Sequence, residues 1–211
     1  MEDKNDMIKN IIFDLGNVVF KWNQDEIVAN FSDNLEEQEE LKNKIFKSEE
    51  WLKLDEGIID YNTAIEIFRK KTNETLGEKI NYIMNTWYKF MPINNEVIEL
   101  IKKLKQEGYR IYILSNTHVS VYNYIKTLEI VKYIDGMIIS SIEKLMKPNK
   151  EIYSRLIEEY KLIPQECFFI DDGEKNVKTA IECGMNGYVF NINNFDGLIN
   201  ELIKNKIYIS K

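Results

Sequence analysis

Short apolar runs alternate with amphipathic segments along most of this chain. The runs are at most seven residues long, rich in Ile, Phe, Val and Tyr, and bounded by Gly, Asn or Asp. This pattern is typical of buried strands. The predicted strands are residues 8–14, 110–115, 137–140, 166–172 and 187–191. The segments between them predict helices at residues 94–107, 148–160, 174–183 and 198–205.

The helical pattern is clearest in the segment NNEVIELIKKLKQE. Its apolar residues recur at spacings of three and four, and Gly108 follows as a stop signal. Strands that alternate with helices of this length predict an α/β fold, with a parallel sheet covered by helices on both faces.

Residues 21–91 differ from the rest of the chain. They are rich in Glu, Lys and Asn, and the segments AIEIFRKK and INYIMNTWYKF have helical periodicity. We expect a small insertion of about four helices between the first strand and the rest of the sheet. The predicted division is therefore a core of residues 1–20 plus 92–211 and a helical unit of residues 21–91.

Composition narrows the classes of protein. The chain has 211 residues, 44% of them hydrophobic, and a net charge of −7, so we expect a packed core and no nucleic-acid partner. Cys167 and Cys183 lie in apolar patterns, which predicts buried free thiols and a reducing compartment. The start, MEDKNDMIKN, is too polar for a signal peptide, and no apolar run is long enough for a membrane span. We expect a cytoplasmic protein without a membrane partner; no feature of the sequence indicates an oligomeric state.

Polar residues follow three of the predicted strands. Asp14 and Gly16 follow the first, Ser115 and Asn116 end the second, and the pair Asp171 and Asp172 ends the fourth. A single Asp in such a position is often only a turn or capping residue. Three such ends at one edge of a parallel sheet, where ligands bind, favour a functional site.

Converging acids need an opposing charge, because otherwise at least one of them stays protonated. Mg²⁺ supplies such a charge, and it prefers carboxylate and carbonyl oxygens, water and phosphate. Lys147 in the segment LMKPNKEIY is a second candidate cation, since Pro148 favours an extended conformation that can direct the lysine toward the strand ends. Taken alone, this lysine is better explained as a solvated surface residue, and only the order of all four segments favours the site.

The order of the segments FDLGNVV, LSNTH, KPNKEIY and FIDDGEKN resembles the haloacid dehalogenase-like (HAD) hydrolase superfamily. The resemblance spans nearly the whole chain and is closest, in FDLGNV, to alpha-D-glucose-1-phosphate phosphatase-like members. It implies a Rossmann-like catalytic core with an inserted helical cap domain. It also implies a Mg²⁺-dependent phosphatase that hydrolyses a small phosphorylated metabolite, with a sugar phosphate as one candidate, through an aspartyl-phosphate.

The resemblance also implies roles for single residues. Asp14 is the implied nucleophile, and Lys147 stabilises the charge on it and on the phosphoryl group. Ser115 and the backbone N–H of Asn116 bind the phosphoryl group. The implied metal ligands are Asp14, the carbonyl of Gly16 and Asp172, with Asp171 acting through a metal-bound water or behind the direct ligands. Asn176 either orients a metal-bound water or is an ordinary residue on a helix face.

Gly16 departs from the family pattern, in which most phosphatases carry an aspartate two residues after the nucleophile. That aspartate protonates the leaving oxygen and later activates water, and glycine has no side chain for either step. Three explanations are open: a leaving group that departs readily, such as an anomeric sugar oxygen; an acid from the insertion, with Asp25 and Glu26 as candidates by proximity in sequence; or slow or lost catalysis. The first predicts that a sugar 1-phosphate is hydrolysed faster than its 6-phosphate isomer.

Two other functions remain open at this stage. A 2-haloacid dehalogenase also uses an aspartate nucleophile, but it needs no metal and gains nothing from the acid pair in DDGEKN. A catalytically weak binding or regulatory protein of the same fold is favoured only by Gly16. His118, the single histidine, is expected to open a helix and face solvent, and the aromatics Trp51, Trp87, Tyr88 and Phe90 are expected to pack the insertion, with one of them facing the substrate as an alternative.

Overall fold

The computed structural model describes residues 7–209. Residues 1–6, which make up most of the polar N-terminal segment MEDKNDMIKN, lie outside the described residues, and so do residues 210–211.

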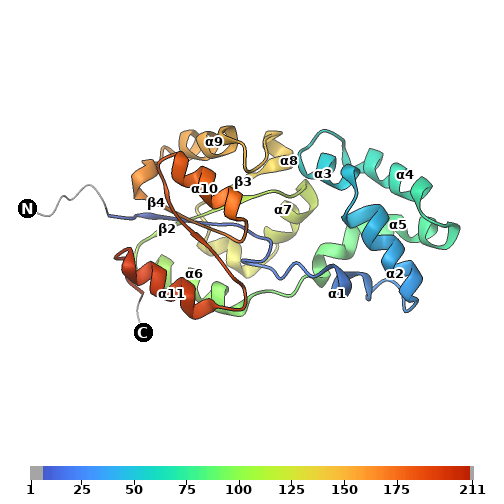
Figure 1. The fold of residues 1–211 in the computed structure, drawn as a ribbon, viewed down its shortest axis with the longest axis horizontal. Helices are drawn as coiled ribbons and strands as arrows, with labels where there is room; N and C mark the ends of the chain where they lie inside the picture. Colours follow the sequence, from blue (N-terminus) through green and yellow to red (C-terminus); the bar gives the residue numbers. More distant parts are fainter. Residues whose placement is uncertain (1–6, 210–211) are drawn as a thin grey trace, which may run out of the picture.

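A parallel sheet of five strands forms the centre of the fold, in the order β3-β2-β1-β4-β5 (Figure 1). The strands are β1 (Asn10–Phe13), β2 (Arg110–Ser115), β3 (Gly136–Ile139), β4 (Cys167–Asp171) and β5 (Asn186–Val189). The order reverses at β1, because the chain adds β2 and β3 on one side of it and β4 and β5 on the other. Ligands bind at such a reversal in parallel sheets, beyond the carboxyl ends of the strands.

Helices cover both faces of this sheet, as the sequence predicts (Figure 1). The α-helices of this part are α6 (Asn95–Gln106), α7 (Val119–Ile125), α8 (Ser140–Glu143), α9 (Lys150–Tyr160), α10 (Glu174–Glu182) and α11 (Phe195–Lys204). The 3₁₀-helices are η3 (Glu129–Tyr133) and η4 (Pro164–Glu166).

Alternating side chains of the strands enter two hydrophobic clusters. Ile11 and Phe13 pack with α6 and α11 on one face, whereas Ile12 and Phe169 pack with α9 and α10 on the other. Both faces of a strand are therefore buried, which explains why the strands appear in the sequence as continuous apolar runs rather than as alternating ones. This burial fixes the register of the strands, because a slip of one residue would exchange the two faces.

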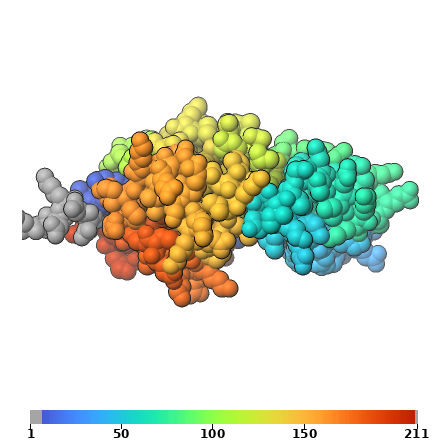
Figure 2. All heavy atoms as spheres, turned by 90° about the horizontal axis from the view of Figure 1, so that it is seen from above, coloured from blue at the N-terminus to red at the C-terminus, as the bar shows by residue number. Residues whose placement is uncertain are grey.

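The insertion between β1 and α6 is helical. Its elements are α1 (Gln24–Val28), α2 (Leu35–Leu41), the π-helix η1 (Lys42–Phe46), α3 (Glu49–Asp55), α4 (Tyr61–Lys71), α5 (Glu74–Thr86) and the 3₁₀-helix η2 (Trp87–Phe90). They form a lobe at the end of the sheet where the strands finish (Figure 1). In Figure 2 this lobe meets the rest of the molecule where the segment around residue 140 packs on α3.

The structure corrects several details of the prediction. The insertion contains five α-helices rather than four, because Ser48 and Asn73 act as N-caps that divide its periodic segments. β3 ends at Ile139 rather than at residue 140, since the hydroxyl of Ser140 accepts a hydrogen bond from the backbone N–H of Thr117 and Ser140 starts α8. Cys183 is half-buried, and Cys167 is buried; both thiols are free.

Among residues 7–209, no helix combines the length and the apolar character that crossing a membrane requires.

Candidate active site at the carboxyl ends of the strands

The register of the sheet brings the first and fourth strand ends together. Phe13 pairs with Ile170, so Asp14 and Asp171 leave adjacent strands at the same level. The backbone N–H of Asp14 donates to the carbonyl of Ile170 over 2.9 Å, which extends the ladder by one step. Asp14 is 7% exposed and Asp171 is fully buried, so neither is an ordinary turn residue at the surface.

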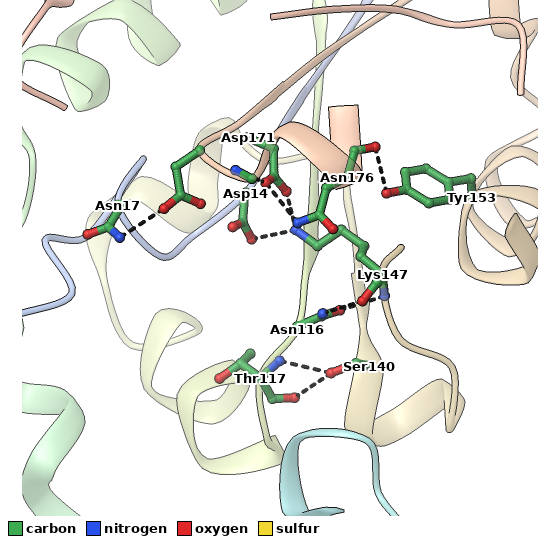
Figure 3. Close-up of polar contacts among 11 residues, drawn as sticks. Asp14, Asn17, Asn116, Thr117, Ser140, Lys147, Tyr153, Asp171 and Asn176 are labelled. Atoms are coloured by element: carbon green, nitrogen blue, oxygen red, sulfur yellow. Dashed lines mark hydrogen bonds and ion pairs between the residues drawn. The ribbon is translucent and has the colours of Figure 1, made fainter. Parts of the chain in front are cut away.

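Lys147 lies between these two acids (Figure 3). Its Nζ atom is 2.9 Å from Oδ1 of Asp14 and donates a hydrogen bond to Oδ2 of Asp171. The lysine side chain is 1% exposed, which excludes the solvated surface position. Two carboxylates raise the pKa of Lys147 against the lowering effect of its burial, so the ammonium form is the stable one.

Asn116 fixes the backbone that carries this lysine. Its side-chain oxygen accepts from the N–H of Lys147 over 2.8 Å, and its side-chain N–H donates to the carbonyl of Lys147 over 2.9 Å. The sequence predicts only a backbone contact from Asn116 to a phosphoryl group. The structure adds this reciprocal pair, which ties the second strand end to the lysine (Figure 3).

Asp171 is held by three donors from two segments, Lys147 and the start of α10. Its Oδ1 accepts from the backbone N–H of Gly173 over 2.7 Å and from the side chain of Asn176 over 2.9 Å. Its Oδ2 faces Lys147, and the carbonyl of Asn176 accepts from the hydroxyl of Tyr153, which anchors the start of α10. Asn176 therefore positions the Asp171 carboxylate, and it is not simply a residue on an exposed helix face.

Asp172 completes the acidic group from a more open position. It is exposed, and its Oδ2 accepts from the side chain of Asn17 over 2.9 Å. Asn17 in turn accepts from the backbone N–H of Trp22 over 3.0 Å, at the point where the chain enters the insertion. Asn17 lies within the segment FDLGNVV, where no role was predicted for it, and it links the site to the insertion.

The three acids fit a divalent cation. One carboxylate oxygen from each of Asp14, Asp171 and Asp172 lies within 4.8 Å of the others. Lys147 neutralises only one of the three negative charges, and Oδ1 of Asp14 is buried without an aligned hydrogen-bond donor. A hard cation that prefers carboxylate oxygens would supply the missing positive charge.

Asp14 responds to this surplus of negative charge. Burial and the neighbouring Asp171 raise its pKa to about 6, although Lys147 and the hydroxyl of Ser115 both act to lower it. Positive charge placed beside Asp14 lowers its pKa and favours the carboxylate, which is the nucleophilic form.

A cavity of about 310 Å³ opens above the strand ends. The core contributes Asp14, Gly16, Ser115, Asn116 and Asp172, among others, to its lining. The insertion contributes an aromatic wall, the side chains of Trp22, Phe46, Trp51 and Trp87. Most of these rings pack edge to face, with centroids 5.0 Å apart for Trp51 and Trp87, so each ring supports its neighbours in the wall. Trp51 and Trp87 were expected to pack the insertion, with one aromatic facing the substrate as the alternative, and both of them line the cavity.

Asp55, the last residue of α3, also lines this cavity. The residue as a whole is half-buried, but its Oδ1 atom is inaccessible to solvent and has no hydrogen-bond partner. Burial raises the pKa of Asp55 well above its ordinary value of 3.8, and the Trp51 side chain opposes this rise only in part. The carboxyl group is therefore held toward its protonated form.

This raised pKa predicts how an Asp55→Asn variant responds to pH. A group whose pKa is higher in the folded state than in the unfolded state stabilises the protein at low pH. It loses this contribution as the pH rises from the unfolded-state pKa through the folded-state pKa. Asparagine has no such loss, so the melting temperature of the variant relative to the parent should increase as the pH rises above the ordinary aspartate value of 3.8. Scanning calorimetry at several pH values checks this, and a constant difference would contradict it.

Three residues that the sequence drew attention to lie elsewhere than expected. His118 does open α7, but it is fully buried rather than facing solvent, because Trp51, Tyr61 and Trp87 pack around its ring. Burial lowers the pKa of this histidine to about 3.

Asp25 and Glu26 do not line the cavity: Asp25 is exposed and pairs with Lys42, and Glu26 accepts from Asn23. Proximity in sequence was a poor guide for these two acids.

Comparison with known proteins agrees with this geometry. Residues 8–184 match the family of haloacid dehalogenase-like hydrolases. D-ribitol-5-phosphate phosphatase from Bacteroides thetaiotaomicron is 28% identical over 190 residues, which cover 84% of this chain and 89% of that protein. Flavin mononucleotide hydrolase 1 from Arabidopsis thaliana is 29% identical over 153 residues, which cover 72% of this chain but only 60% of that protein.

A solved structure shows the same likeness. A HAD family enzyme from Bacteroides thetaiotaomicron, in complex with magnesium and inorganic phosphate, matches with a TM-score of 0.71 and 26% identity. The match covers 88% of this chain and 95% of that one.

Proposed function

This chain belongs to the haloacid dehalogenase-like hydrolase family, and we propose that it is a Mg²⁺-dependent phosphatase that hydrolyses a small phosphorylated metabolite through an aspartyl-phosphate. One observation supports this most strongly. Asp14 lies at the base of a cavity between a buried lysine and two further carboxylates that can share a cation with it. Relatives named as phosphatases, one of them acting on a sugar-alcohol phosphate, support a substrate of this class. A sugar phosphate is our candidate.

In this proposal the two parts of the chain divide the work. Residues 1–20 plus 92–211 form the catalytic core, which carries the acids and Lys147. Residues 21–91 form a cap, whose aromatic wall faces the part of the substrate beyond the phosphoryl group. A cavity of about 310 Å³ is at the lower end of the range for small-molecule sites, so the substrate is a small metabolite.

The residues at the strand ends then have distinct roles. Asp14 attacks phosphorus, and Lys147 offsets the negative charge of the attacking carboxylate and of the phosphoryl group. Ser115 and the backbone N–H of Asn116 bind the phosphoryl oxygens. Asp14, Asp172 and the carbonyl of Gly16 would hold Mg²⁺, with Asp171 acting through a metal-bound water or behind the direct ligands. Bound Mg²⁺ screens the charges that would otherwise keep the carboxylate and the phosphate apart.

A panel of phosphorylated metabolites and p-nitrophenyl phosphate, assayed with and without Mg²⁺, tests the proposal. We expect release of inorganic phosphate that depends on Mg²⁺ and stops when EDTA is added, because charge screening is then lost. Turnover of 2-chloropropionate that is unaffected by EDTA would support the dehalogenase instead. An absence of turnover with every phosphate ester would support the binding protein.

Binding of Mg²⁺ can be measured apart from turnover. A cation that binds only the folded state stabilises it, by about 2.7 kcal/mol at a hundredfold excess over the dissociation constant. We therefore expect Mg²⁺ to raise the melting temperature by several degrees, about 2–4 °C for each kcal/mol in a chain of this size. Asp172→Asn should remove most of this shift, and Asp196→Asn, which changes an exposed acid in the first turn of α11, should keep it. Equal shifts in both variants would place the cation elsewhere.

A further inference from the structure

We propose that Asp55 is the acid that protonates the leaving-group oxygen and then activates water, in place of the carboxylate that position 16 lacks. This inference rests on the proposed phosphatase function and identifies a further catalytic residue for it. The acid comes from the insertion, on a helix about 40 residues after Asp14 in the chain, and the two residues meet only in the folded protein.

The space beside the nucleophile is open to such a group. A Cβ atom built at Gly16 meets nothing within 4 Å, and Gly16 itself lines the cavity. The region in which a side chain at position 16 would lie is therefore part of the substrate cavity. Asp55 lines the same cavity as Asp14, and among the insertion residues that line it Asp55 is the acid.

The end of α3 is anchored to the core rather than free to move. The hydroxyl of Ser140 donates to the backbone carbonyl of Asp55, and the same hydroxyl accepts from the N–H of Thr117 over 2.9 Å. Thr117 follows Ser115 and Asn116 directly, so this network connects Asp55 to the predicted phosphoryl-binding segment (Figure 3 shows Ser140 and Thr117).

A glycine at position 57 permits this close approach. Gly57 has φ +75°, and a Cβ atom there would lie 2.4 Å from the carbonyl oxygen of Ser141. Any other residue at this position would push the end of α3 away from the core. The anchoring uses the backbone carbonyl of Asp55 and not its carboxyl group.

The carboxyl group has the character that an acid catalyst needs. Asp55 lines the cavity, so a substrate oxygen can approach its carboxyl group there, and the Oδ1 atom has no hydrogen-bond partner among residues 7–209. Its burial favours the neutral form, which carries a proton to donate. Asp14 instead lies beside Lys147, which favours its ionised form. The two acids thus differ in the way that a nucleophile and a proton donor require.

The proposed reaction is balanced in both halves. In the first, a carboxylate oxygen of Asp14 bonds to phosphorus, the bond from phosphorus to the leaving oxygen breaks, and that oxygen takes the proton of Asp55. In the second, water attacks phosphorus and gives a proton to the Asp55 carboxylate, while the bond to Asp14 breaks. One ester and one water give one alcohol and one phosphate, and both aspartates return to their starting forms.

This assignment changes the expected substrate range. With glycine at position 16, the sequence alone favours leaving groups that depart without help, such as an anomeric oxygen. An acid at Asp55 also permits the esters of ordinary alcohols, whose oxygens need a proton as they leave.

The test compares two leaving groups in an Asp55→Asn variant with Mg²⁺ present. For ribitol 5-phosphate, a primary-alcohol ester, we expect kcat to fall about 100-fold or more, the usual contribution of a general acid. For p-nitrophenyl phosphate, whose phenolate leaves without protonation, we expect the aspartyl-phosphate to form at a rate within about threefold of the parent in a rapid-quench measurement of p-nitrophenol release. Asp25→Asn, which changes an exposed acid outside the cavity, should alter neither rate.

A second substitution provides a rescue. Because position 16 is open, Gly16→Asp in the Asp55→Asn background places a carboxyl group in the same space. For the primary-alcohol ester, we expect kcat of this double variant to be at least tenfold higher than kcat of Asp55→Asn. Asp55→Ser provides a second way to remove the carboxyl group if the asparagine variant does not fold.

The outcomes separate this inference from the proposed function. A parent protein that hydrolyses neither ester contradicts the phosphatase proposal itself. A parent that is active while Asp55→Asn slows both esters equally, or slows neither, overturns the role of Asp55 and leaves the phosphatase proposal standing. Activity of the parent toward p-nitrophenyl phosphate only, or the failure of both Asp55 variants to fold, also overturns that role.

Discussion

Replacing Asp14 with asparagine is expected to remove phosphatase activity almost completely, by about 10⁴-fold or more, as loss of a nucleophile does in other enzymes. The amide cannot form the acyl-phosphate bond on which both halves of the reaction depend. The variant should fold, because asparagine is nearly isosteric and neutral, and Lys147 retains Asp171 as a partner. The measurement is kcat with p-nitrophenyl phosphate and saturating Mg²⁺.

The position of the covalent bond gives an independent check. In the parent, acid quenching during turnover should trap a phosphoryl group on the peptide that contains Asp14, and the peptide from Asp14→Asn should carry none. Asp25→Asn serves as the matched control for the change of acid to amide, because its side chain is exposed and outside the cavity. Residual activity above about one per cent of the parent would mean that another group attacks phosphorus.

Most of the core of this site could be predicted from sequence, because strand register does the positioning. Once residues 10–13 and 167–171 are recognised as neighbouring strands, Asp14 and Asp171 must leave the sheet at the same edge. Lys147 was a weaker prediction, since a single lysine has many possible environments. Its position between two acids is fixed by two hydrogen bonds from the Asn116 side chain to the backbone of Lys147, and such bonds have no sequence signature.

The contribution of the insertion could not be predicted in this way. Helical periodicity identifies which face of α3 is apolar, but it does not indicate where the helix docks. Asp55 reaches the cavity through the contact of its backbone with Ser140 and the close approach at Gly57. His118 was misplaced for a related reason: it follows a strand end, where polar residues are usually exposed, and the aromatic side chains that bury it come from the insertion.

Asp25 and Glu26 are the opposite case: they are close to Gly16 in sequence, but the packing of the insertion keeps them out of the cavity. They are the acids nearest to Gly16 in the insertion sequence, yet α1 turns them toward solvent and toward Lys42 and Asn23. Distance along the chain is informative within a strand–turn–helix unit, where the backbone path is short and fixed. It is uninformative across a helical lobe, where packing decides which residues meet.

Replacing Lys147 with methionine is expected to have the second largest effect, on both stability and activity. Methionine keeps much of the volume but removes the charge that two buried carboxylates share. Removing one partner of a buried ion pair costs about 3–5 kcal/mol, because the remaining charges lose their compensation. Activity should fall by about 10²–10³-fold, as expected when a group that stabilises the charge of the transition state is lost.

The dependence of this stability loss on pH identifies its cause. Lys147 lowers the pKa of Asp14, so without it that pKa rises further above about 6 and the neutral form becomes favoured. A group with a raised pKa in the folded state stabilises at low pH and loses that contribution as the pH rises through the folded value. Parent and variant lose the Asp14 contribution alike up to about pH 6, so the deficit of Lys147→Met should be smallest at low pH and grow as the pH rises past about 6.

Lys150→Met is the matched control for this variant. Lys150 lies three residues further along the chain, where it is exposed and pairs with Glu182 at the surface over 2.9 Å. Exposed pairs of this kind contribute little to stability, so we expect no growing deficit with pH. Urea unfolding of both variants at several pH values makes the comparison. A deficit for Lys147→Met that is the same at every pH would attribute the loss to packing of the side chain and not to the charge that holds the two acids together.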